Sequence, residues 1–162
     1  MTGRAPLSSE ALQQELGPLV ERSRQSFGMA VLELRAENLL PVVNVLRDKF
    51  DFTLFLDVTA IDFPERSPRF DLVYHFYSPR HNQRIRLKLG VTTEPPVVPT
   101  LTTHYGAARY MEREVHDMYG IGFAGNADLR PILLYEGFVG HPLRKDYPIE
   151  REQPVVAYRS PG

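Results

Sequence analysis

The sequence alternates apolar and polar residues in Phe70-Asp-Leu-Val-Tyr-His-Phe-Tyr77, and again in Arg84-Ile-Arg-Leu-Lys-Leu-Gly-Val91. A two-residue period is typical of β-strands that bury one face of a sheet. Between these segments stands Ser78-Pro-Arg-His-Asn82, which is rich in residues that favour turns. Together the three stretches predict a β-hairpin and indicate an antiparallel sheet.

Further elements are predicted on both sides of this hairpin. Apolar residues at helical spacing indicate helices at about 8–20, 37–50 and 105–118. Gly17-Pro18 is expected to kink or end the first helix, and Pro41 is tolerated in the first turn of the second. Strands are predicted at 29–35 and 52–61, and a proline-rich connector at 92–99. The elements predict a two-layer α+β domain over residues 1–130, with a mostly antiparallel sheet packed against helices.

Composition narrows the functions open to this domain. The 162 residues suit one domain, and the formal net charge of −1 argues against nucleic acid or an anionic membrane surface as a partner. With no cysteine, disulfides, cysteine-ligated iron–sulfur clusters, cysteine zinc sites and a thiol nucleophile are excluded. No secretory signal follows Met1, and the apolar windows are shorter than the roughly 20 residues that span a bilayer. We expect a soluble, cytoplasmic chain.

Residues 131–162 form the most informative segment. The segment contains five prolines and has neither helical nor strand periodicity. A disordered tail is normally poor in apolar residues, yet here they continue, at 132–135, 138, 143, 147, 155 and 156. We interpret the segment as an extended, proline-rich C-terminal arm that packs on a partner protein. The alternative is an ordered loop that wraps back over its own domain.

Gly120-Ile-Gly-Phe-Ala-Gly125 matches the glycine fingerprint of dinucleotide-binding loops. That fingerprint needs a strand before it and a helix after it. Here the preceding segment has helical spacing, and Pro131 prevents a long helix from Gly125. Gly120 is instead predicted to end the preceding helix in a left-handed conformation. A helix directly before Gly120, and none from Gly125, would exclude nucleotide binding.

Glu112-Arg-Glu-Val-His-Asp117 is a dense charged patch on the third predicted helix. Glu112 and His116 share a helix face, and so could ligate a metal, but two ligands do not make a site. Glu114 and Asp117 could act as an acid–base pair. A stand-alone, metal-dependent hydrolase that uses Glu112, Glu114, His116 and His141 remains an alternative. The other interpretation is a solvated helix face with ion pairs, or a charged docking surface.

Gly140-His-Pro-Leu-Arg-Lys-Asp-Tyr-Pro148 places a histidine, two cations and a carboxylate in an extended run. His141 could carry a proton or serve as a hydrogen-bonded fixture. Arg144 and Asp146 could form buried ion pairs with a partner, and breaking such a pair typically costs about 3–5 kcal/mol. We therefore expect Arg144→Ala or Asp146→Ala to impair assembly before any intrinsic chemistry.

The charged patch and the arm also resemble a known family. Its signature is matched by Glu112-Arg-Glu-x-x-Asp117-Met-Tyr-Gly120-Ile-x-Phe123, Asp128-Leu-Arg130, Ile132-Leu133 and the run 140–148, in the same order and spacing. The family is the 30-kilodalton subunit, also called the C subunit, of proton-translocating NADH:quinone oxidoreductase, or respiratory complex I. The resemblance extends over about residues 37–148. The chain departs from the family at Tyr110, His116, Asn126 and Pro131, where Trp, an aromatic, His and Arg are usual.

The resemblance implies a non-catalytic peripheral-arm subunit that supports assembly during electron transfer from NADH to quinone. Such a chain carries no cofactor, and FMN and iron–sulfur clusters lie on other subunits. Its partners would be subunits D and B and the neighbouring iron–sulfur subunit. It would meet the cytoplasmic side of the inner membrane only through the complex. A related membrane-bound hydrogenase-type complex is the alternative assembly. Residues expected to dock on partners are Glu112, Arg113, Glu114, Asp117, Asp128, Arg130, His141, Arg144, Lys145 and Asp146.

Overall fold

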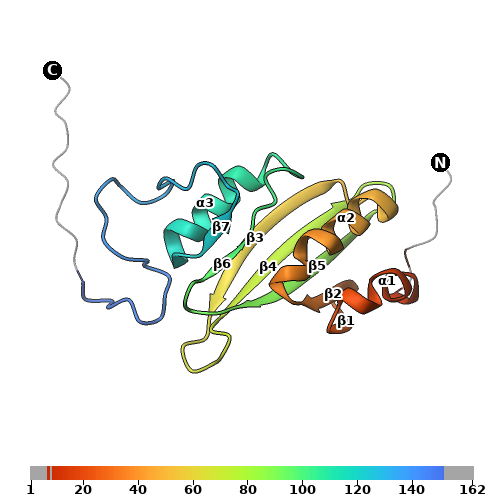
Figure 1. The fold of residues 1–162 in the computed structure, drawn as a ribbon, viewed down its shortest axis with the longest axis horizontal. Helices are drawn as coiled ribbons and strands as arrows, with labels where there is room; N and C mark the ends of the chain where they lie inside the picture. The colour runs from red at the N-terminus through yellow and green to blue at the C-terminus, as the bar shows by residue number, and fades with distance from the viewer. Residues whose placement is uncertain (1–6, 8, 152–162) are drawn as a thin grey trace, which may run out of the picture.

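A computed structural model describes residue 7 and residues 9–151 (Figure 1). The elements are, in chain order, α1 (Ser9–Leu16), the 3-10 turn η1 (Gly17–Leu19), β1 (Arg22–Ser26), β2 (Met29–Leu34), the 3-10 turn η2 (Ala36–Asn38), α2 (Leu39–Phe50), β3 (Leu54–Asp62), β4 (Phe70–Ser78), β5 (Gln83–Val91), β6 (Val97–Pro99), α3 (Ala108–Tyr119) and β7 (Gly122–Ala124). Residue 8, where the first predicted helix begins, and the apolar residues 155 and 156 lie outside the described residues.

Five strands form a mixed sheet in the order β1-β2-β5-β4-β3. All neighbours run antiparallel except β2 and β5, which are parallel. The predicted hairpin is confirmed as β4 and β5, with Tyr74 opposite Leu87 and Phe76 opposite Ile85. The α+β class with a mostly antiparallel sheet is therefore confirmed. Strands β6 and β7 form a separate parallel pair.

One face of the sheet makes the core. Phe70, Leu72, Tyr74 and Phe76 alternate along β4 and are completely buried. Figure 1 shows α2 lying across this sheet, and its apolar residues join the same core cluster. Full burial of one large apolar side chain stabilises a fold by about 1.5–3 kcal/mol. The alternating residues of the hairpin thus contribute substantially to the stability of the domain.

The helix ends follow local chemistry. Gly17-Pro18 ends α1, and Pro41 lies in the first turn of α2, as predicted. Gly120 ends α3 with a φ of 71°, so the predicted left-handed terminator is confirmed. Glycine adopts this conformation without a steric penalty because it has no Cβ.

Three short strands depart from the sequence predictions. The sequence does not predict β1, because this edge strand carries Arg-Ser-Arg-Gln-Ser and shows no apolar alternation. The sequence also does not predict β6, which lies within the expected proline-rich connector at 92–99, or β7, which follows Gly120. These two strands have only three residues each, too few to show a period.

The segment after residue 130 differs from the domain. None of residues 131–151 is buried, and none belongs to the core cluster. In Figure 1 this blue segment loops away from α3 and then runs back below it. We call residues 131–151 the arm, and the division of the chain at 130/131 stays a prediction. Within residues 7 and 9–151, no helix combines the length and apolarity that crossing a membrane requires.

Candidate functional site

The charged residues of α3 hold the chain's own loops and arm. Glu112 is completely buried and accepts hydrogen bonds from Thr100 Oγ1 at 2.6 Å, the Leu101 amide at 2.7 Å and Asn126 Nδ2 at 2.9 Å. Burial raises the pKa of Glu112, and these hydrogen bonds offset only part of the rise. Glu112 thereby ties together the segments that follow β6 and β7. The interpretation of a solvated helix face is wrong for this residue.

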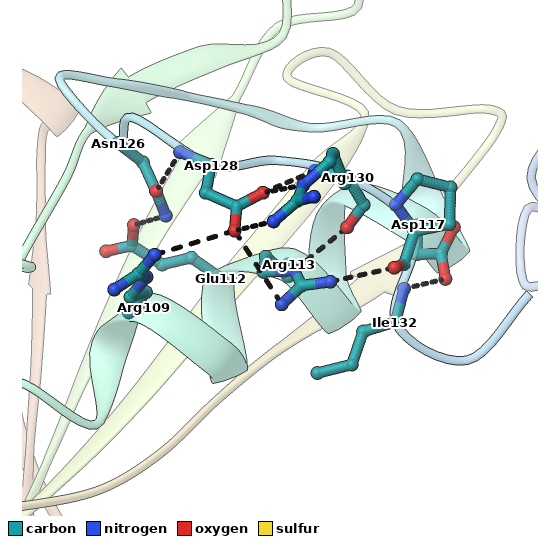
Figure 2. A network of polar contacts seen from close by, with 9 residues as sticks. Arg109, Glu112, Arg113, Asp117, Asn126, Asp128, Arg130 and Ile132 are labelled. Atoms are coloured by element: carbon teal, nitrogen blue, oxygen red, sulfur yellow. Dashed lines mark hydrogen bonds and ion pairs between the residues drawn. The ribbon is translucent and has the colours of Figure 1, made fainter.

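Next to Glu112 along α3, Arg113 reaches the start of the arm. Its Nε donates to the Arg130 carbonyl at 2.9 Å, and an Nη donates to the Pro131 carbonyl at 2.8 Å. Figure 2 shows Arg109, Arg113 and Arg130 converging on Asp128. Hydrogen bonds from the Arg130 side chain and amide hold the pKa of Asp128 well below its usual range. Because both Asp128 oxygens engage Arg130, the chain is fixed just before the arm begins.

The first anchor of the arm is Asp117, which is buried near the end of α3. Its Oδ2 accepts hydrogen bonds from the amides of Ile132, Leu133 and Leu134 at 3.1, 2.9 and 2.9 Å. Burial alone would raise the pKa of Asp117, but the three amides outweigh it and lower the pKa. One carboxylate thus satisfies three successive backbone groups, and the solvated-face interpretation is wrong here too.

The second anchor is Asp62, a buried residue at the end of β3. Arg69 binds both of its oxygens at 2.7 Å, and the Lys145 amide donates to Oδ2 at 2.7 Å. Arg69 also donates to Asp146 at 2.9 Å. The hydrogen bonds from Arg69 are the main reason that the pKa of Asp62 is lowered. Sequence reasoning missed Asp62 and Arg69 as site residues, although both lie within the range that resembles the family.

Between the two anchors, arm residues pair with the last turn of α3. His141 Nδ1 lies 3.0 Å from the Asp117 carbonyl, and the Leu143 amide donates to the Met118 carbonyl at 3.1 Å. Arg144 Nε donates to the Tyr119 carbonyl. The arm therefore satisfies backbone carbonyls that the helix leaves free at its C-terminus.

Gly120 permits this close approach. A Cβ on Gly120 would lie 2.4 Å from His141 Nε2 and 2.6 Å from an Nη of Arg144. Such distances are far shorter than any normal contact, so a side chain here would displace the arm. Gly120 thus both adopts the left-handed conformation that ends α3 and leaves room for His141 and Arg144 of the arm.

Most large apolar side chains of the arm are exposed, although its backbone is bound to the domain. Leu133 is 61% exposed and Val139 is 57% exposed. The other large exposed apolar residues of the arm are Ile132, Tyr135, Leu143 and Ile149. Phe138 stacks on Tyr147, but only within the arm itself. The arm is thus fixed by its polar groups, while six of its large apolar side chains are exposed.

The structure brings together only two of the predicted catalytic groups: the ring centroids of His116 and His141 lie 6.4 Å apart and the two rings line one pocket with Asp117, while neither Glu112 nor Glu114 lines it. Both Glu112 oxygens are engaged, Glu114 is not buried, and His116 and His141 each direct Nδ1 to a backbone carbonyl. Within the described part of the chain, no group of three potential metal ligands occurs. A helix runs directly into Gly120, and none begins at Gly125, so the criterion set for excluding nucleotide binding is met.

Comparison with known proteins places this arrangement in a family. A model of the respiratory-chain NADH dehydrogenase 30 Kd subunit matches residues 32–153. The chain belongs to this family. It is 46% identical over 140 residues to the C subunit of NADH-quinone oxidoreductase from Sinorhizobium medicae, covering 85% of this chain and 69% of the relative. The corresponding C subunit from Brucella abortus is 41% identical over the same coverage.

Two solved structures share the fold of this 30 Kd family member. A trypsin-resistant fragment of Nqo5 superposes with a TM-score of 0.62 at 28% identity, covering 67% of this chain and 89% of the fragment. A chain of the membrane-bound sulfane sulfur reductase, an archaeal respiratory membrane complex, gives a TM-score of 0.73 at 24% identity and covers 87% of this chain and 85% of its own. The resemblance to the 30-kilodalton, or C, subunit family of NADH:quinone oxidoreductase that the sequence predicts is thus confirmed.

Proposed function

We propose that this chain is a non-catalytic scaffold subunit of a proton-pumping NADH:quinone oxidoreductase, and that its arm docks on other subunits. The observation that carries the proposal is that the backbone of the arm is bound to the domain, while apolar side chains of the arm are exposed. Its backbone is held by Asp117 and Asp62, while its apolar side chains face outward. An extended segment held in place loses less conformational freedom on binding than a free one. The anchors thus prepare the arm for a partner.

Residues expected to dock divide into two roles under this proposal. Arg113 and Asp117 bind the backbone of the arm directly. Glu112 and Asp128 hold the segment that leads into it. The charges of Glu114, Arg130, Lys145 and Asp146 are not buried and face a partner, although Arg130 also pairs with Asp128 and Asp146 with Arg69 within the chain. His141 and Arg144 seat the arm on α3.

The partners proposed are subunits D and B and the neighbouring iron–sulfur subunit. FMN and iron–sulfur clusters would lie on other subunits, while this chain supports the quinone-site subunits during electron transfer from NADH. It would be a peripheral protein on the cytoplasmic side of the inner membrane, held there only through the complex. The formal charge of −1 supports protein partners rather than nucleic acid.

A hydrogenase-type or similar membrane complex remains the second candidate assembly. The fold shared with a chain of the sulfane sulfur reductase supports it. The identity of 41–46% to relatives from NADH-quinone oxidoreductase, against 24% to that chain, favours the NADH:quinone oxidoreductase.

The test exchanges apolar arm side chains for serine in a strain that lacks the native chain. Val139→Ser is compared with Val97→Ser, a matched control because Val97 is 46% exposed on β6. We expect Val139→Ser, and more strongly Val139→Ser with Leu133→Ser, to reduce the assembled complex in native gels of detergent-solubilised membranes. Both isolated chains should unfold at the wild-type temperature. Equal assembly of the arm variants and Val97→Ser would contradict arm docking.

A further inference from the structure

The second face of the five-stranded sheet is not part of the core. Its buried apolar residues, Val31 and Val73, lie outside the core cluster. Val31 lies in register between Arg24 of β1 and Arg86 of β5. Residues in register share a face, so the long side chains of these arginines border the valine. We call this the open face.

The open face carries more cations than carboxylates. Alternation and register place five cations on it, against three carboxylates: Arg22, Arg24, Arg84, Arg86 and Lys88, against Glu33, Asp57 and Asp71. Glu33 is shared by two arginines, and Asp71 by Arg66 and Lys88.

Two of these cations on β5 pair with no carboxylate of residues 7 and 9–151. Arg86 donates to His75 Nε2 at 2.8 Å, and this nitrogen accepts only when it carries no proton. Burial, followed by the charge of Arg86, lowers the pKa of His75. Among the described residues, no carboxylate lies within ion-pair distance of Arg84 or Arg86. This part of the open face is therefore suited to an anionic partner.

An aromatic side chain projects at the end of the open face. Phe27 forms the β1–β2 turn with Gly28, at φ values of 51° and 74°, and it is 105% exposed. Two-residue turns with positive φ at both positions favour Asn-Gly or Asp-Gly, because asparagine and aspartate tolerate this backbone. Phenylalanine is thus a poor choice for the turn itself, and it contributes nothing to the core.

Beside Phe27 lies an open concavity of about 760 Å³. Apolar and aromatic surface from three strands lines it, through Met29, Leu56 and Tyr77, and Arg84 stands at its side. Aromatic residues and arginine are the types that carry most binding energy at protein interfaces. The turn, the concavity and the arginines without a carboxylate partner are continuous on one face.

We infer that the concavity beside Phe27, with Arg84 and Arg86, is a second docking surface, which receives an acidic segment of another subunit of the complex. The inference rests on the proposed function only in requiring that the chain be a subunit of that complex. A second copy of this chain fits poorly, because a symmetric contact would bring the same arginines together. Binding of this face to an anionic membrane is an outcome of the test.

Substitution at Phe27 gives a sharp first test. Phe27→Asn removes the aromatic ring but suits the turn, so the isolated chain should unfold at the same temperature or higher. Retention of the chain in the complex should nevertheless fall about tenfold on challenge with salt, because an aromatic anchor is lost. Retention equal to wild type would overturn the inference.

A cysteine introduced next to Phe27 can measure how accessible this surface is while Phe27 is kept. The chain has no cysteine, so Ser26→Cys adds its only thiol, next to Phe27, and Gln14→Cys on α1 serves as the control. In the assembled complex we expect the thiol at position 26 to react at least about tenfold more slowly with maleimide than in the free chain. A cross-linker attached there should join an Asp- or Glu-rich segment of another subunit, and Arg84→Glu should abolish that product.

The remaining outcomes separate the alternatives. Equal labelling of the thiol at position 26 in the free and assembled chains overturns the inference, as does a cross-link to a second copy. Protection of the free chain by vesicles of phosphatidylcholine and phosphatidylglycerol, with none in the detergent-solubilised complex, assigns the face to a membrane instead. If the wild-type chain itself does not enter the complex, the proposed function fails. If it enters with the thiol fully reactive, only this inference fails.

Discussion

The sheet domain and the arm are both ordered, but different interactions hold the backbone in each. In the domain, alternating side chains from β4 and β5 are buried on one face, so apolar contacts hold the backbone. In the arm, carboxylates of the domain hold the backbone, and the apolar side chains remain outside. The comparison shows that a segment can have an ordered backbone even though its apolar side chains are not buried. A segment without a core can be placed accurately if a few buried acceptors satisfy its amides.

The largest effect is expected at Glu112, which belongs to the domain. Glu112→Ala leaves the partners at Thr100, Leu101 and Asn126 without an acceptor, so the free energy of unfolding should fall by about 3–5 kcal/mol. Urea denaturation of the isolated chain measures it. Glu114→Ala, on the same helix but not buried, should change it by less than about 0.5 kcal/mol. Equal losses would show that burial does not distinguish the two residues.

A smaller loss is expected at Gly120, where domain and arm meet. Gly120→Ala imposes a positive φ on alanine and places a Cβ against His141, so stability should fall by about 1–3 kcal/mol. Amide exchange of 132–147 should also rise. Gly106→Ala is the control, because a Cβ there meets nothing within 4 Å. If Gly120→Ala left arm exchange unchanged, the arm would not depend on the close approach.

Lowering the pH should weaken the anchoring of the arm, whereas protonation of Glu112 should stabilise the domain. The pKa values of Asp62 and Asp117 are lowered in the fold, so their anchoring is complete above the ordinary carboxyl pKa of about 4 and is lost as pH falls through the lowered values. The pKa of Glu112 is raised, so its protonation favours the folded domain as pH falls. Amide exchange of the arm should therefore rise before the domain unfolds. Asp62→Asn should weaken this dependence, and simultaneous loss of arm and domain would contradict the separation.

The smallest effect is expected at Asp146. Its carboxylate is 56% exposed and contacts Arg69, so Asp146→Ala should lower the stability of the isolated chain by less than about 1 kcal/mol. The cost expected for a buried pair therefore does not apply within this chain, and a larger loss on assembly would have to come from a partner. Thermal unfolding of the free chain, compared with native gels of the complex, separates the two contributions.

Sequence patterns predicted the elements whose residues follow a period or a local signal, and they missed features that depend on contacts between distant residues. The β4–β5 hairpin and the end of α3 at Gly120 follow from local signals, namely alternation and a glycine terminator. The parallel pairing of β2 with β5 joins residues far apart in the chain, and nothing in either strand specifies its neighbour. Glu112 was misjudged because a charge at helical spacing normally faces solvent. Its burial depends on Thr100 and Asn126, which no helix pattern reveals.

The position of the two anchoring carboxylates also sets an order of events during synthesis. Asp62 ends β3 and Asp117 lies near the end of α3, so both precede the arm along the chain. Domains generally fold as units, from the N-terminus, as the ribosome extends them. The acceptors can therefore be in place when residues 132–134 emerge, so the arm can be anchored as soon as it is synthesised. A nascent subunit would thus offer the arm to its partners only after the domain that anchors it has formed.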